Sequence, residues 1–267
     1  MTMMSGTRLL KLLTAAGILA AVCNCAEDNN GALVISQMQT LDPETCQVDP
    51  SEEIFRGAGI LDMAVARSYT VFPLIRNNIL DIVKSKGFQA RDFRLNTKDV
   101  SLRRAVLSFS PFEETEVAFP TVELPLSGTV STESQAIVGI EAISSGLINE
   151  LRNSRQFITV GSQGDVRPAR DSITVSLKLV VHGQTNDGNE VESNPFFFKL
   201  EICNGCLVFY PPSASGPDGP APNCSNSEEE ILPEQLCAVG QDRPLHCLVC
   251  SAFAPDPLAR QLCQPPL

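Results

Sequence analysis

Residues 172–179, which read SITVSLKL, and residues 196–202, which read FFFKLEI, carry the pattern that decides the fold of this chain. In both stretches an apolar residue recurs at every second position, which is the period of a strand with one buried face. The loop between them contains Asp187-Gly188, a pair that adopts the positive φ angles of a tight reversal. The sequence therefore predicts an antiparallel β-hairpin.

Six further stretches show strand patterns, and they lie at residues 33–38, 59–66, 69–75, 100–109, 122–130 and 135–140. Pro125 lacks an amide donor, so we expect its strand at the edge of a sheet. Short strands, turn residues between them and no regular alternation of strands with helices favour a sandwich over a doubly wound fold. We therefore predict a mainly β protein with a β-sandwich-like domain and one or two short helices.

Two segments show apolar residues at helical spacing. The first, residues 139–155, predicts a short helix packed on the sheet. Its apolar positions are Ile140, Ile143, Leu147 and Leu151. The second segment, residues 73–86, admits two interpretations. It is either a helix that starts near Pro73 or a strand that continues from residue 69 into a long loop.

The first 25 residues have the features of an export signal. Arg8 and Lys11 form a positive start, and residues 12–22 form a largely apolar run. This run is too short to span a bilayer, which takes about 20 apolar residues, and acidic residues follow it. We therefore assign residues 1–25 to a signal peptide and expect no transmembrane helix in the mature chain.

Cys23 and Cys25 at the end of this segment suggest a lipoprotein-like cleavage region, in which one cysteine is acylated. Acylation of Cys25 leaves eight cysteines, an even number that can pair completely, whereas acylation of Cys23 leaves nine. Parity therefore favours Cys25, with Cys23 as the alternative, although Val22 and Asn24 depart from the usual small residues before such a cysteine. Acylation tethers a chain to a membrane surface without crossing it. Ordinary cleavage to a free exported protein is the other possibility.

Seven of the ten cysteines lie in the last 65 residues. Export brings them into an oxidising compartment, where paired cysteines persist as disulfides. We therefore divide the mature chain into a β-sandwich-like domain, residues 26–202, and a small irregular disulfide-rich C-terminal segment, residues 203–267. The pairing stays open at this point. The cysteines predicted to form disulfides are Cys46, Cys203, Cys206, Cys224, Cys237, Cys247, Cys250 and Cys263.

Two C-x-x-C pairs stand out, Cys203 with Cys206 and Cys247 with Cys250. Four such thiolates can bind zinc, but zinc ribbons place the pairs about 15–20 residues apart. Here about forty residues separate them. A redox-active dithiol is expected at a helix N-terminus in a thioredoxin-like unit, whereas Cys203 ends a predicted strand. Structural bridging is the favoured interpretation, and we predict no metal ligand and no cofactor.

The composition and the remaining motifs exclude several classes of function. The formal charge is −11, and −13 without residues 1–24, which argues against nucleic-acid binding because that needs a basic surface. The two histidines, His182 and His246, are interpreted as ordinary loop residues. The motif at residues 161–164 lacks the full nucleophile elbow of a serine hydrolase. We therefore predict no catalytic residue and no enzyme.

A resemblance rests on five stretches: YTVFPLIRNN at residues 69–78, the strand at 100–109, residues 196–206 with the overlapping core ICNGCLV at 202–208, CAVGQD at 237–242 and CLVC at 247–250. In these motifs and their order, the chain resembles a group of uncharacterised bacterial envelope lipoproteins with a β-rich body and a cysteine-rich tail. The resemblance implies location and architecture and adds no catalytic residue.

Two classes of function follow as expectations. We favour a non-enzymatic exported component of the bacterial cell envelope, in the outer membrane or periplasm, that binds an unknown protein or surface ligand. Its membrane contact would be the lipid anchor, if acylated. The alternative is a redox or metal-handling module that uses the C-x-x-C pairs.

Overall fold

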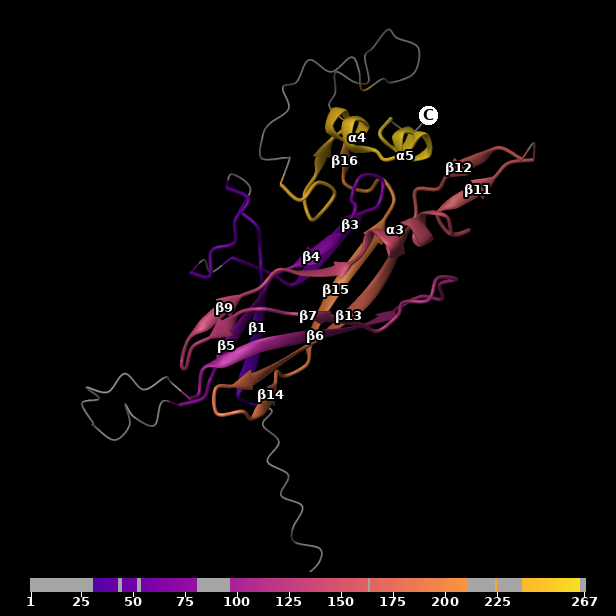
Figure 1. The fold of residues 1–267 in the computed structure, drawn as a ribbon. Helices are drawn as coiled ribbons and strands as arrows, with labels where there is room; N and C mark the ends of the chain where they lie inside the picture. The colour runs from indigo at the N-terminus through magenta and orange to yellow at the C-terminus, as the bar shows by residue number, and fades with distance from the viewer. Residues whose placement is uncertain are drawn as a thin grey trace, which may run out of the picture.

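The structure is a computed structural model that describes residues 31–42, 45–51, 54–80, 97–162, 164–210, 224 and 237–264. The expected signal peptide and the candidate lipidation sites Cys25 and Cys23 lie outside these residues. The described part is mainly β and contains three short helices. Figure 1 shows a body of long strands with the C-terminal tail, in yellow, gathered at one end.

The main sheet has the strand order β3-β15-β13-β6-β7, with β14 paired to β13 and β8 paired to β6. The strands are β3 (Ala58–Asp62), β6 (Val100–Pro111), β7 (Val122–Pro125), β8 (Thr129–Val130), β13 (Ser172–Thr185), β14 (Glu190–Glu192) and β15 (Phe196–Cys203). The pairing of β13 with β15 is antiparallel and sets Ile173 opposite Ile202. Gly188 has a φ of 92° in the reversal between β13 and β14. The predicted hairpin is therefore confirmed.

A second sheet has the strand order β2-β1-β5-β9, and a separate ribbon pairs β4 with β10. These strands are β1 (Leu33–Gln39), β2 (Phe55–Arg56), β4 (Tyr69–Val71), β5 (Pro73–Asn77), β9 (Gln135–Ile137) and β10 (Ile140–Ile143). Buried side chains of these strands, such as Ile35, Ile75 and Ile140, share one core with Leu107 and Leu177 of the main sheet. Two sheets that enclose one apolar core form a sandwich-like body, as the sequence predicts.

The long predicted strands are divided where the chain changes partner. Residues 69–75 split at Phe72, because β4 pairs with β10 whereas β5 pairs with β1 and β9. Residues 122–130 likewise split into β7, which pairs with residues 104–107 of β6, and β8, which pairs with residues 100–101. Pro125 lies in β7, the last strand of the main sheet, so its predicted edge position is confirmed.

The helix predicted over residues 139–155 is only half right. The helix α3 spans Ser145–Arg152, and Ser144 caps it by accepting a hydrogen bond from the Leu147 amide. Residues 140–143 form the strand β10 instead. Its pairing with β4 shifts register between Glu141 and Ile143, and such a bulge places two residues three positions apart on the same buried side. This bulge imitates helical spacing in the sequence.

The ambiguous segment begins as a strand. Residues Pro73–Asn77 form β5, which pairs on both sides, so the interpretation as a helix starting at Pro73 is wrong. Residues 78–80 have no regular secondary structure, and residues 81–86 lie outside the described residues.

The tail has its own small core around two helices that the sequence did not predict, α4 (Cys247–Phe253) and α5 (Pro257–Leu262). They pack beside two parallel bridging strands, β16 (Val208–Phe209) and β17 (Leu245–His246). Asp256 caps α5 by accepting a hydrogen bond from the Ala259 amide at 2.8 Å. Pro at the first position after a capping Asp is a recognisable helix start. Among the helices of the described residues, none has both the length and the apolar character that crossing a membrane requires.

Candidate functional site

The eight cysteines predicted to form disulfides are all bonded in the structure. The pairs are Cys46–Cys237, Cys203–Cys206, Cys224–Cys247 and Cys250–Cys263. The first C-x-x-C motif thus closes on itself, whereas the two cysteines of the second motif bond to different partners. Because a sulfur in a disulfide is not a thiolate, neither motif offers zinc ligands in this state.

The loop of residues 238–242 directly follows Cys237 of the Cys46–Cys237 bridge and runs along the outer edge of β3. The Asp62 amide donates to the Gly240 carbonyl at 2.8 Å, and the Asp242 amide donates to the Ile60 carbonyl at 2.9 Å. Leu61 forms an antiparallel bridge with Gln241. The tail therefore covers the unpaired edge of the main sheet, which would otherwise be open to pairing with another chain.

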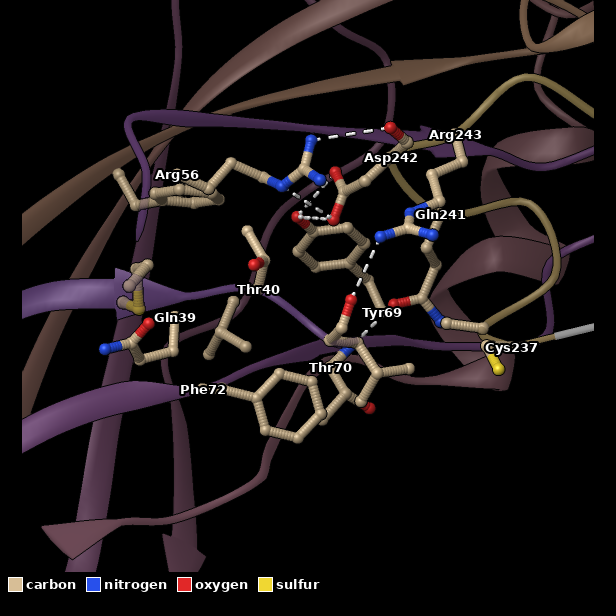
Figure 2. A pocket seen from close by; sticks show the side chains of 15 residues that line it. Gln39, Thr40, Arg56, Tyr69, Thr70, Phe72, Cys237, Gln241, Asp242 and Arg243 are labelled. Atoms are coloured by element: carbon tan, nitrogen blue, oxygen red, sulfur yellow. Dashed lines mark hydrogen bonds and ion pairs between the residues drawn. The ribbon is translucent and has the colours of Figure 1, made fainter. Parts of the chain in front are cut away.

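A polar cluster forms where this loop meets β4 (Figure 2). Both carboxylate oxygens of Asp242 accept hydrogen bonds from the Tyr69 hydroxyl, at 3.1 and 3.2 Å, and Oδ1 also accepts from the Ile60 amide at 2.8 Å. Arg56 Nε lies 3.6 Å from Asp242 Oδ2. Gln241 accepts from the Thr70 amide at 3.1 Å. In this cluster, residues far apart in the sequence are joined because their polar groups are hydrogen-bond or ion-pair partners of one another.

Burial sets the protonation of this cluster. It raises the pKa of the Tyr69 phenol, and the neighbouring Asp242 carboxylate raises it further, so the phenol keeps its proton and acts as a donor. Burial also raises the pKa of Asp242, against the effect of the Ile60 amide and Arg56. A phenol held protonated is not a base. The cluster is suited to fastening the tail rather than to proton transfer.

The cavity beside the cluster is small. It is lined by the end of β1, by β4 and by residues 237–243, and its volume is about 40 Å³. A space of this size holds about one water molecule and is far below the several hundred Å³ of a typical small-molecule site. We therefore interpret the cluster, which we call the tail clasp (Arg56, Tyr69, Gln241 and Asp242), as structural.

A second polar centre lies under the Cys203–Cys206 disulfide. The carboxylate of Asp62 accepts hydrogen bonds from the amides of Ala64, Gly205 and Leu207 at 2.9, 2.7 and 2.9 Å. A carboxylate oxygen of Asp62 and the two sulfur atoms all lie within 4.8 Å of one another. Asp62 has no exposed surface, and burial raises its pKa above the ordinary value despite these hydrogen bonds.

The two histidines are not loop residues, which corrects the interpretation from the sequence. His182 lies inside β13, and its Nδ1 is 3.7 Å from Glu192 Oε2 on the paired strand β14. His246 is 3% exposed and caps α4 through Nδ1, which accepts from the Leu248 amide at 3.1 Å. It lies within 4.8 Å of the sulfur atoms of Cys224 and Cys247, which are bonded to each other.

The described residues of the serine motif, 161, 162 and 164, lie in a hairpin turn. It joins β11 (Ile158–Val160) to β12 (Val166–Pro168), and the Gly161 amide donates to the Asp165 carbonyl at 2.8 Å. Val160 and Val166 are paired across this hairpin, and their side chains are 67% and 41% exposed. The hairpin is thus an exposed apolar feature rather than a nucleophile elbow.

Sequence reasoning missed Asp62, Tyr69 and Asp242. A signal existed for Asp62, because a single acid inside the apolar run from Ile60 to Val65 indicates a buried, hydrogen-bonded carboxylate. Tyr69 and Asp242 lie 173 residues apart, so no local pattern links them.

Fold and site together define a class: a β-sandwich-like body whose sheet edge is covered by a disulfide-bonded tail. A scan of protein-family models and a search of curated proteins both found no match for the chain.

Proposed function

We propose that this protein is a non-enzymatic exported component of the bacterial cell envelope that binds a protein partner. The four disulfides support the compartment, because such bonds persist in oxidising surroundings and are rare in the cytosol. The apolar leader and Cys25, with Cys23 as the alternative, support export and lipid anchoring. Kinship with the uncharacterised envelope lipoproteins is part of the same proposal.

The observation that carries the binding role is the β11–β12 hairpin. In Figure 1 it projects from the body beside the tail. Among the described residues its two strands pair only with each other, although β12 also contacts α5, and a two-stranded hairpin is marginally stable by itself. Exposed apolar side chains at such a place cost free energy unless another surface covers them. The Val160–Val166 pair therefore supports contact with an apolar patch of a partner protein.

Site-specific photo-crosslinking in an exporting host tests this role. A photoreactive residue replaces Val160 in one variant and Thr159 in the control, because the adjacent side chain is also exposed but points to the opposite face of the hairpin. We expect a discrete adduct at position 160, at least about fivefold more abundant than at 159. We also expect Val166→Ser to weaken it, since this change removes apolar surface from the same face. Equal labelling at both positions, or no adduct at either, would exclude the hairpin as the binding surface.

Location is tested separately by the mass of the mature N-terminus. A diacylglyceryl adduct on Cys25 or Cys23 supports the anchored form, and an unmodified start just after this region supports a free exported protein. A reporter that is active only outside the cytoplasm, fused to the C-terminus, checks export itself. An inactive reporter contradicts the proposed compartment.

A further inference from the structure

The Cys203–Cys206 disulfide differs from the other three in what it holds together. It closes a loop between residues only three positions apart, whereas the others span 13, 23 and 191 positions. The entropy that a disulfide removes from the unfolded chain grows with the length of the loop it closes. This bridge therefore contributes least to stability of the four, so a purely structural explanation accounts for it least well.

The loop around it is fixed by other contacts. The amides of Gly205 and Leu207 donate to Asp62, and the Met63 amide donates to the Cys203 carbonyl at 2.8 Å. Arg170 Nη1 donates to the Gly205 carbonyl at 3.1 Å. These hydrogen bonds do not depend on the S–S bond, so the two sulfur atoms stay close together when that bond opens.

The two sulfur atoms differ in accessibility. Cys203 ends β15 and has no exposed surface, whereas Cys206 lies on the surface. Cys203 Sγ lies 3.5 Å from the Leu61 carbonyl oxygen, which can accept a thiol proton after reduction. An accessible sulfur beside a buried one gives thiol–disulfide exchange a direction, because attack is possible at the accessible sulfur only and the other sulfur is the leaving group.

We propose that Cys203–Cys206 is a redox-active disulfide that exchanges with a dithiol of a partner protein, with Cys206 as the attacked sulfur. A partner thiolate attacks Cys206 Sγ, a new S–S bond forms, and the Cys203–Cys206 bond breaks. Cys203 leaves as a thiolate and takes up a proton from solvent, which receives the proton that the partner thiol loses.

The second thiolate of the partner then attacks the partner's first sulfur, which is bonded to Cys206 in the mixed disulfide. This attack releases Cys206, which takes up the second proton. Two electrons pass to this chain, and the two protons it gains equal those the partner loses. The partner's dithiol becomes a disulfide.

A redox titration of the oxidised mature protein tests whether the bridge opens alone. The protein is equilibrated in glutathione buffers of increasing reducing power, its free thiols are alkylated, and each cysteine peptide is quantified by mass spectrometry. We expect Cys203–Cys206 to open with an equilibrium constant at least about tenfold more favourable than that of any other bridge. The other three disulfides serve as internal controls. Opening of Cys203–Cys206 together with any of the other three bridges, or after one of them, would overturn the proposal.

Two matched variants test the direction of attack. Cys203→Ser leaves a free thiol at position 206, and Cys206→Ser leaves one at position 203. The reaction with glutathione disulfide is followed in both, after mass mapping has confirmed that the other three bridges are intact. We expect position 206 to react at least about tenfold faster, because only that sulfur is accessible. Equal rates would overturn the assignment of Cys206, and no reaction at either position would overturn the exchange itself.

Discussion

At the scale of single residues, a few buried polar groups hold distant parts of the chain together. The clearest is Asp242, which accepts hydrogen bonds from Tyr69 and from the Ile60 amide. Its φ of 62° lies in the left-handed region, where Asp and Asn are the most tolerated residues after Gly. A carboxylate with this many partners fixes the loop that carries it, because leaving any of those donors unpaired costs free energy.

The raised pKa of Asp242 predicts a pH dependence of stability. The folded chain binds this proton more tightly than the unfolded chain, whose carboxyl titrates near its ordinary value of about 3.9. As pH rises above about 4, the unfolded state loses its proton first, and the free energy of unfolding falls until the folded carboxyl has also ionised. Asp242→Asn removes this contribution. Urea denaturation across the acid range should therefore show wild type losing stability relative to the variant as pH rises.

Asp187 provides a control of opposite sign. Lys98 and the Thr185 hydroxyl lower its pKa to about 2, so its contribution is present above pH 3.8 and is lost as pH falls through about 2. Compared with the Asp187→Asn variant, the wild-type protein should therefore gain stability as pH rises over that range. Two variants with slopes of the same sign would contradict the assigned environments.

At the scale of elements, the protein is organised by what covers each strand edge. One edge of the main sheet ends in β7, where Pro125 offers no amide to a further strand. The other edge, β3, is covered by residues 238–242 of the tail. Just after β3, Arg152 of α3 donates to the carbonyls of Met63 and Ala66 and holds the turn that follows the strand.

The close contact between this loop and that turn can be tested at Gly240. Its φ is 78°, and a Cβ there would lie 2.6 Å from Val65 Cγ2 and 2.8 Å from the Ala66 amide nitrogen. Gly240→Ala should therefore destabilise the protein by about 3 kcal/mol, from overlap and left-handed strain together. Gly188→Ala is the control, because its φ is 92° but nothing lies within 4 Å, and it should cost only about 1 kcal/mol. Denaturant unfolding of both variants measures the difference, and equal losses would mean that the loop does not pack against this turn.

At the scale of the whole molecule, the Cys46–Cys237 bridge and the tail clasp join the tail to the body. The bridge connects cysteines 191 positions apart. Most of the tail's own apolar side chains pack among themselves, with Ala64 and Val65 of the body included in their core. The tail is attached to the body by this covalent bridge and by polar contacts, including those of Asp62 and Arg170 with the tail backbone.

Loss of this bridge should have a large effect. Cys46→Ser combined with Cys237→Ser removes a crosslink whose loop-closure entropy corresponds to about 5 kcal/mol, whereas Cys203→Ser with Cys206→Ser removes about 2 kcal/mol. Non-reducing urea denaturation of both double variants gives the comparison. A smaller loss for the first pair than for the second would show that the tail is held without its disulfide.

Local features, such as strands and turns, could be predicted from the sequence, whereas the contacts between distant residues could not. Period-two alternation located β13 and β15 and the turn between them, because that pattern depends only on which face of a strand is buried. The same reasoning failed at residues 140–143, where a bulge brought two isoleucines three positions apart to the same side. It also missed α4 and α5, whose short length leaves little room for periodicity.

By itself, then, the sequence determined a mainly β fold, the edge position of Pro125 and the group of cysteines that become oxidised. These properties reside in residue types and their local order. Only the tertiary structure decided which cysteines pair, that Asp62 lies beneath the Cys203–Cys206 bridge and that Tyr69 meets Asp242. Such contacts join positions up to 191 residues apart. They are selected by how the two sheets and the tail pack around a shared core, which no local pattern encodes.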